Sequence, residues 1–241
     1  VENAEAINSE DSDFGPSFYG NNQIVFASSR STGSLSRRVH KWNGQAFLQL
    51  YSSKIDGKGR LKKPNKFSSV LNSKWHESTP AFTADGQTVY FTRNNSEKNK
   101  LQEDEDGLTK LKIYRSKLDG DNWSRPEEVS FSSDEYNTAH PAITPDCTKM
   151  FFVSDMPGSL GYDPEAKFLE SDIWVADIAA DGSLGTPTNV IGINTYGRES
   201  FPFVSKNNVL YFASTGHQGL GGLDVFASTI NPDGTMSKPV N

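Results

Sequence analysis

Acidic residues recur at one place in a repeated phrase of the sequence. Asp13, Glu77 and Glu199 each stand three residues before a proline, and Thr138 stands at the same place before a fourth proline. Carboxylates that gather at one point can bind a cation or a basic side chain, or can act as acid and base in hydrolysis. They can also accept hydrogen bonds that hold neighbouring segments together. The sequence favours this last, structural role and leaves cation binding as the alternative.

The histidines and the single cysteine lack the spacing of a catalytic or metal site. His40, His76, His140 and His217 occupy different places in their surroundings, and no His-x-x-x-His pair indicates zinc. Cys147 falls in a turn where sister segments carry Gly or Asn, so we expect a loop substitution and not a nucleophile. No Gly-x-Ser-x-Gly elbow occurs. The sequence therefore predicts no catalytic residue, no metal site and no cofactor.

Composition narrows the class of protein. The chain has 241 residues, of which 34% are hydrophobic and 22% charged, so we expect a packed core and not global disorder. The formal net charge of −6 disfavours nucleic-acid binding. No apolar run is long enough for a membrane-spanning helix, so we expect no direct membrane span. One cysteine allows no intrachain disulfide, and from the start at Val1 we expect a mature or excised piece.

Five landmarks recur in the same order four times along the chain. Each unit begins with a proline phrase and continues with an apolar run, a second apolar segment, an Asp-Gly turn and a closing proline. The opening prolines are 64, 61 and 61 residues apart: Pro16, Pro80, Pro141 and Pro202. Short apolar runs separated by Gly, Asn and Asp predict antiparallel strands joined by tight turns. The pattern therefore predicts four strands in each unit.

Repeated four-stranded antiparallel units are typical of the blades of a β-propeller. We predict an all-β fold in which residues 1–241 form a single β-propeller domain with four four-stranded blades. The repeat units lie at about 12–73, 74–134, 135–194 and 195–241. Tandem sandwich domains are disfavoured, because each unit is too short for an immunoglobulin-like domain.

The residues before the first unit resemble the end of a unit. Glu5–Asn8 matches Ile191–Asn194, so we expect residues 1–11 to form a stray outer strand, the fourth of a blade. Two interpretations follow. This strand closes a four-bladed ring, or the chain is part of a larger propeller.

In a propeller, the segment that enters the innermost strand lies beside the central channel. Asp13, Glu77, His140 and Glu199 all fall in this segment, directly before or near the opening prolines. We therefore expect them at one channel mouth, where they would bind a ligand or link neighbouring blades.

The segments between the second and third strands vary most among the units. Residues 96–112, 156–170 and 215–222 are insertions of different composition. Variable loops on one face of a rigid scaffold often bind partners, so we expect an interaction surface there. The candidate contact residues are Arg37, Trp42, Tyr162 and His217. Exposed aromatic side chains such as Trp42 or Tyr162 would favour a glycan as the ligand.

The landmarks resemble the WD40-like repeat (PD40) of the TolB type. That repeat runs Pro-x-Phe-(Ser/Thr)-x-Asp-Gly, then Tyr-Phe-x-Ser, then Asp-Ile-Trp, and the segments Thr79–Gly86, Phe151–Ser154 and Asp172–Trp174 fit it. The first unit departs from it, with Asn21-Asn22 in place of Asp-Gly. The resemblance covers nearly the whole chain.

Some phrases are similar to one subset of these propellers. Segments such as His76–Thr79, Ser154–Gly158 and Gly219–Asp224 resemble the propeller of OmpA-family proteins from Bacteroidetes, among them PorE of the type IX secretion system. This resemblance implies a periplasmic, outer-membrane-associated scaffold that contacts outer-membrane or secretion-system proteins. It implies peptidoglycan as a partner only through flanking domains that lie outside this sequence.

The resemblance supplies no catalytic residue. We therefore expect a non-enzymatic propeller that mediates protein–protein contacts in the bacterial envelope. A glycan- or peptidoglycan-binding propeller is the alternative, and a glycosidase-like enzyme is the less favoured one.

Overall fold

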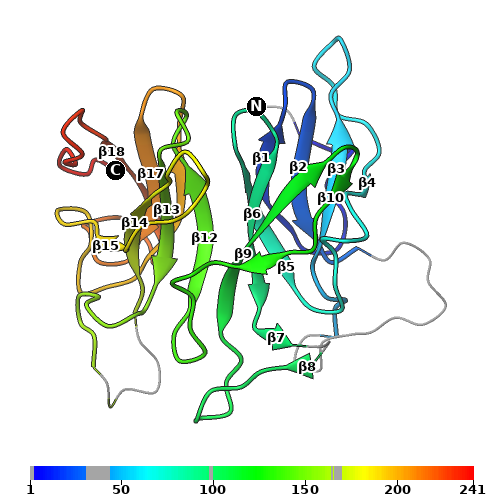
Figure 1. Cartoon of the computed structure of the whole chain (residues 1–241). Helices are drawn as coiled ribbons and strands as arrows, with labels where there is room; N and C mark the ends of the chain where they lie inside the picture. Colours follow the sequence, from blue (N-terminus) through cyan, green and yellow to red (C-terminus); the bar gives the residue numbers. More distant parts are fainter. Residues whose placement is uncertain (1–2, 31–43, 98–99, 164, 166–169) are drawn as a thin grey trace. The chain divides into compact units, whose positions relative to one another are not determined.

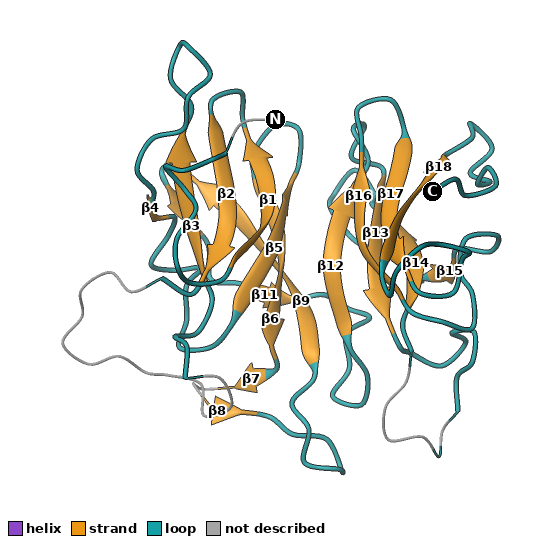
Figure 2. Cartoon of the chain, turned by 180° about the vertical axis from the view of Figure 1, so that it is seen from behind, coloured by secondary structure: helices purple, strands orange, loops and turns teal. Residues whose placement is uncertain are grey.

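The computed structural model describes residues 3–30, 44–97, 100–163, 165 and 170–241. All the regular elements in these ranges are β-strands, and each paired strand is antiparallel to its neighbour (Figures 1 and 2). The chain divides into two compact units. Unit 1 holds residues 1–101 and 114–127, and unit 2 holds residues 102–113 and 128–241.

Unit 1 is built around two sheets. The first sheet has the strand order β1 (Asp13–Tyr19), β2 (Gln23–Ser28), β3 (Gln49–Lys54) and β4 (Asn65–Lys66). The second sheet has the order β10 (Asn122–Trp123), β9 (Leu111–Asp119), β6 (Thr88–Asn94) and β5 (Glu77–Phe82), and β11 (Glu127–Glu128) also pairs with β9. A small hairpin of β7 (Ser96–Glu97) and β8 (Lys100–Leu101) extends from the loop after β6.

Unit 2 repeats the pattern. Its first sheet has the order β12 (Thr138–Ile143), β13 (Lys149–Ser154), β14 (Asp172–Asp177) and β15 (Thr188–Asn189). Its second sheet has β16 (Glu199–Val204), β17 (Val209–Ser214) and β18 (Asp224–Thr229), and a bridge between Ala227 and Val240 marks the place of a fourth strand. The predicted all-β propeller with four blades is confirmed, one blade per repeat unit.

The innermost strand of each blade carries a bulge directly before the opening proline. The pairing register shifts at this point in β1, β5, β12 and β16. The residue before each proline has a left-handed backbone, with φ of 61°, 44°, 54° and 51°: Gly15, Thr79, His140 and Phe201. A bulge inserts one extra residue and turns the strand, which explains why the same backbone conformation returns in every unit.

The turn after the innermost strand also repeats. Gly86, Cys147 and Asn208 all have positive φ, of 69°, 58° and 55°. Cys147 therefore stands where the turn needs a left-handed residue, as the sequence comparison predicts. In the first blade the turn is tighter, and Gly20 takes this conformation in place of Asn22.

Near the start of the chain, the described residues do not form the outer strand that the sequence predicts for residues 1–11. Within the described residues 3–12, the chain forms a turn in which the amides of Ile7 and Asn8 donate to the carbonyl of Ala4. The matching segment Ile191–Ile193 is also a turn, which follows the short strand β15. The alignment of the two segments is thus sound, but they are turns and not strands.

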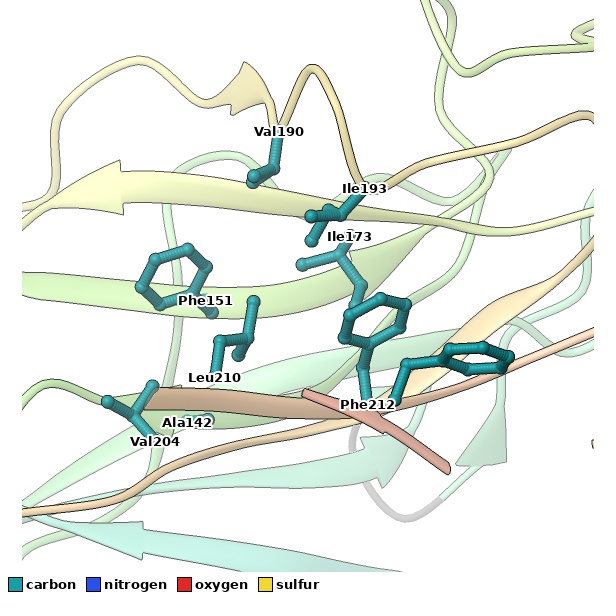
Figure 3. Close-up of a cluster of buried hydrophobic side chains, with 9 residues drawn as sticks. Ala142, Phe151, Ile173, Val190, Ile193, Val204, Leu210 and Phe212 are labelled. Atoms are coloured by element: carbon teal, nitrogen blue, oxygen red, sulfur yellow. The ribbon is translucent and has the colours of Figure 1, made fainter. Parts of the chain in front are cut away.

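Each unit buries its core between two sheet faces. In unit 1, Val25 and Leu50 of the first sheet pack against Val89 and Phe91 of the second. In unit 2, Phe151 and Ile173 meet Leu210 and Phe212, with Ala142 and Val204 at one end of the cluster (Figure 3). Burying a side chain of this size stabilises the fold by roughly 1.5–3 kcal/mol, so these faces hold the two blades of each unit together.

Candidate functional site

The repeated acidic residues begin the innermost strands. Asp13, Glu77 and Glu199 are the first residues of β1, β5 and β16, and Thr138 is the first residue of β12. The sequence alignment on the prolines therefore places them correctly within each blade. Their expected gathering at one channel mouth stays a prediction, because these residues belong to two units.

Glu77 is fully buried and is held by Ser73 and Arg93. Its Oε2 accepts a hydrogen bond of 3.0 Å from the Ser73 amide, and its Oε1 accepts one of 2.5 Å from the Ser73 hydroxyl. The Nε of Arg93 donates to Oε1 at 3.0 Å. A second Arg93 nitrogen donates to the Leu71 carbonyl at 2.7 Å. The carboxylate thus ties strand β5 to the end of β6 and to the segment that leads in from the first blade.

Asp13 repeats this arrangement with other partners. Its Oδ2 accepts hydrogen bonds of 2.7 and 2.6 Å from the amide and hydroxyl of Ser9. Arg30 donates to Oδ1 at 2.7 Å and also donates to the Ile7 carbonyl. The guanidinium lies 5.2 Å from the centre of the Phe26 ring, as the Arg93 guanidinium lies 5.1 Å from Phe91.

Glu199 also accepts hydrogen bonds from the residue four positions before it, but no arginine among the described residues donates to its carboxylate. Thr195 donates its amide and hydroxyl to the carboxylate at 2.9 and 2.7 Å, and Ser214 donates at 2.6 Å. His217 takes the place of the guanidinium: its Nε2 donates to the Ile193 carbonyl at 2.7 Å, and its ring lies 5.0 Å from that of Phe226. His217 is therefore half-buried and held against unit 2, and its predicted role as a contact residue of the loop face stays a prediction.

The partner residues arise from different positions in the repeat, so sequence alignment misses them. Arg93 lies directly opposite Glu77 in the β5–β6 ladder, whereas Ser28 lies opposite Asp13 and Arg30 follows two residues later. His217 follows the corresponding Ser214 by three residues. Only a search for a basic residue at varying distance after the apolar run would find them in the sequence.

The third blade lacks the acid and its counter-charge. Thr138 forms a hydrogen bond of 2.8 Å with the Ser132 hydroxyl. The rings of Phe131 and Phe152 stack with their centres 4.6 Å apart, so aromatic packing is found here where the first two blades have a guanidinium group against rings. Asp155 instead accepts bonds of 2.6 and 2.7 Å from Asn137, which ties the following loop to β12.

The environments of the two acids in unit 1 shift their pKa values in opposite directions. Burial raises the pKa of Glu77 to about 7, although the charge of Arg93 and the Ser73 hydrogen bonds oppose this. Burial also acts on Asp13, but hydrogen bonds from Ser28, Ser9 and Arg30 outweigh it and lower the pKa of that carboxyl group. Both carboxylates already have donors within the chain, which leaves them poorly placed to serve a substrate.

His140 is a neutral, packed side chain. Its ring centre lies 4.5 Å from that of Phe201, the residue at the same bulge position in the next blade. Burial lowers the pKa of His140 to about 4. At neutral pH it is therefore uncharged, which suits packing better than binding an anion.

Asp172, the family-pattern acid of the third strand, is fully buried at the start of β14. Its Oδ2 accepts hydrogen bonds from the Leu160 amide at 2.7 Å and from the Asn189 side chain at 2.5 Å. Its Oδ1 has no partner among the described residues. Burial raises the pKa of Asp172, and the charge of nearby Glu199 adds to this. Asp224 plays a similar part in the next blade, where it accepts from the Gly221 amide at 2.9 Å.

A patch of exposed apolar side chains lies on two loops of unit 2. Leu160, Tyr162 and Tyr196 are 38%, 37% and 81% exposed, and we call them the tyrosine patch. The two loops meet at Gly161, where a Cβ would lie in van der Waals contact with the Tyr196 ring, at 3.6 Å. Tyr162 is thus accessible, as its predicted role as a contact residue requires, and that role stays a prediction. Tyr196 carries no sequence signal that would identify it. The predicted contact residues Arg37 and Trp42 lie outside the described residues.

The described residues contain no cluster of three or more His, Cys, Asp or Glu that could hold a metal ion. Among the same residues there is no helix long and apolar enough to cross a membrane.

Comparison with known proteins supports the class of protein that the sheets define, a β-propeller. An α-L-arabinofuranosidase from Lactobacillus brevis matches with a TM-score of 0.54 at 15% identity, over 95% of this chain and 76% of its own. A puromycin hydrolase matches with a TM-score of 0.51 at 10% identity, over 98% of this chain and 40% of its own. At such identities the similarity shows the fold alone.

A TolB protein from Agrobacterium tumefaciens matches with a TM-score of 0.46 at 18% identity, over 88% of this chain. The chain spans 58% of that protein's length. No family model matches the chain, and no curated protein matches it in sequence.

Proposed function

We propose that this chain is a non-enzymatic propeller scaffold that binds protein partners through the loop face of unit 2. The observation that carries the proposal is the contrast between two sets of residues. The carboxylates that could do chemistry are engaged by donors of the chain itself, as in the bonds of Glu77 to Ser73 and Arg93. The side chains that are exposed and unusual for a surface are apolar, as in the tyrosine patch.

The loops that carry the patch are anchored, which suits a preformed binding surface. The Leu160 amide donates to buried Asp172, and the Tyr162 amide donates to the Ser159 carbonyl at 3.1 Å. Ser159 is itself buried and lies against the Trp174 indole, with a hydrogen bond of 3.3 Å. A surface held in this way loses little conformational entropy when a partner binds.

Tyrosine is enriched at protein interfaces because its ring buries much apolar area and its hydroxyl group tolerates water. The resemblance of the repeated sequence motifs supports a TolB-type propeller and a periplasmic, outer-membrane-associated location. We extend the proposal to partners in the bacterial envelope, with components of the type IX secretion system as the more specific candidates.

The test is capture of partners from a bacterial envelope extract by the immobilised chain. The variant Leu160→Ser/Tyr162→Ser/Tyr196→Ser removes the patch, and the control Ile191→Ser removes an apolar side chain of unit 2 that is more exposed (87%) than any of the three. We expect a protein that the wild type and Ile191→Ser retain and that the triple variant loses at least about tenfold, equivalent to ~1.4 kcal/mol of binding free energy. Equal retention by all three would contradict the proposal.

A further inference from the structure

We propose that unit 1 carries a saccharide-binding pocket between the outer parts of its two sheets, separate from the tyrosine patch. A pocket of about 430 Å³ opens there. Its walls are Tyr19 at the end of β1, the turn at residues 67–70 after β4, and the β9–β10 hairpin around residues 118–123. This volume falls within the range of about 300–1,000 Å³ usual for small-molecule sites.

Aromatic rings form one side of the pocket. The half-buried rings of Tyr19 and Phe67 line it, together with the edge of Trp123, which is 8% exposed and belongs to the core of unit 1, and Phe82 packs against them. Ring centres are 5.5 Å apart for Tyr19 and Phe67, 5.9 Å for Phe67 and Trp123, and 4.7 Å for Tyr19 and Phe82. The rings pack at tilted or edge-on angles, which fixes each of them in place.

The matching place in unit 2 shows that core packing does not require these rings. The backbone is the same: the Phe67 amide donates to the Leu50 carbonyl as the Val190 amide donates to that of Ile173. Aliphatic side chains fill the place in unit 2, with Val190 for Phe67, Val204 for Phe82 and Met236 for Trp123. The aromatic set is therefore particular to unit 1, and its effect is to give the pocket an aromatic wall.

Short polar side chains surround the opening. Ser69, Asp121 and Asn122 are exposed and line the pocket, and their side chains have no hydrogen-bond partner among the described residues. A sugar ring presents C–H groups on its faces and hydroxyl groups at its edge, so it can lie on the rings while its hydroxyl groups bond to a carboxylate and an amide.

Other classes of ligand fit this lining less well. The described lining residues include no lysine or arginine, so a phosphorylated ligand would meet the Asp121 carboxylate without a counter-charge. A wholly apolar ligand would leave the polar side chains without partners. The chemistry of the site therefore favours a neutral, hydroxylated ring.

The experiment is a titration of the isotope-labelled chain, followed by its amide and indole signals. The probes are N-acetylglucosamine, glucose, galactose, xylose and arabinose, each to about 50 mM, far above the ~1 mM scale of weak binding. We expect at least one probe to shift the Trp123 indole signal and the amides of residues 68–70 and 120–122 in a saturable way.

Two variants separate binding from folding. Trp123→Met installs the residue type found at the matching place in unit 2, and Asp121→Ala/Asn122→Ala changes only exposed side chains of the hairpin. Each should weaken binding of that probe at least tenfold while the signals of unit 2 stay unchanged. The proposal is overturned if no probe shifts these signals, or if both variants bind as the wild type does. Neither result would bear on the tyrosine patch, which lies in unit 2.

Discussion

At the scale of single residues, the repeated acids Asp13 and Glu77, in their charged form, stabilise their blades only as long as the arginine beside each is present. Arg93→Met would leave Glu77 buried without its cation, which typically costs about 3–5 kcal/mol. We expect this loss of unfolding free energy at pH 8, measured by chemical denaturation. The exposed pair of Arg198 and Glu170 provides the control, since Arg198→Met should cost under about 1 kcal/mol.

The pH dependence of this variant follows from the raised pKa of Glu77. A carboxyl group whose pKa is higher in the folded state, here about 7 against 4.5, favours folding below pH 4.5 and loses that contribution as the pH rises through 7. Without Arg93 the pKa rises further, because the opposing charge is gone. The Arg93→Met variant should therefore recover much of its stability at pH 5, and an equal deficit at pH 5 and pH 8 would contradict the assignment.

At the scale of structural elements, the sequence predicts the repeated turns but not the short outer strands. Turn residues are local: a left-handed position selects Gly or Asn, so the repeat pattern alone identifies Cys147 as a substitution in a turn. The short outer strands are not local, because their length depends on how each blade packs. For that reason the segment Glu5–Asn8 aligns correctly with its counterpart in the third unit, whereas the prediction that it forms a strand is wrong.

The variant Cys147→Gly tests whether this turn requires a left-handed residue. Cys147 has φ of 58° where Gly86 has 69°, and a side chain in this region costs roughly 1 kcal/mol or more. The greater freedom of glycine in the unfolded chain offsets part of this. We expect the variant to raise the unfolding free energy by up to about 1 kcal/mol in denaturant titrations. An unfolding free energy below that of the wild type would show that the turn does not carry this strain.

At the scale of the whole molecule, the sequence predicts the architecture far better than the sites. The prolines and Asp-Gly turns recur four times and so define the blades, because each of these residue types is selected by the local backbone conformation. The arginines that engage the acids escape alignment, because Arg30 and Arg93 reach equivalent places from different sequence offsets. His217 makes the matching carbonyl contact in the fourth blade from yet another offset. The tyrosine patch and the pocket escape it too, since they depend on which loops meet in three dimensions.

We propose that the repeated carboxylates hold the segments of each blade together and perform no catalysis. The most direct measurement is turnover of chromogenic glycosides and peptide anilides by the purified wild type and by Asp13→Asn/Glu77→Gln/Glu199→Gln. The account predicts background turnover for both proteins, together with a lower unfolding free energy for the triple variant. Turnover by the wild type that the folded triple variant lacks would contradict it.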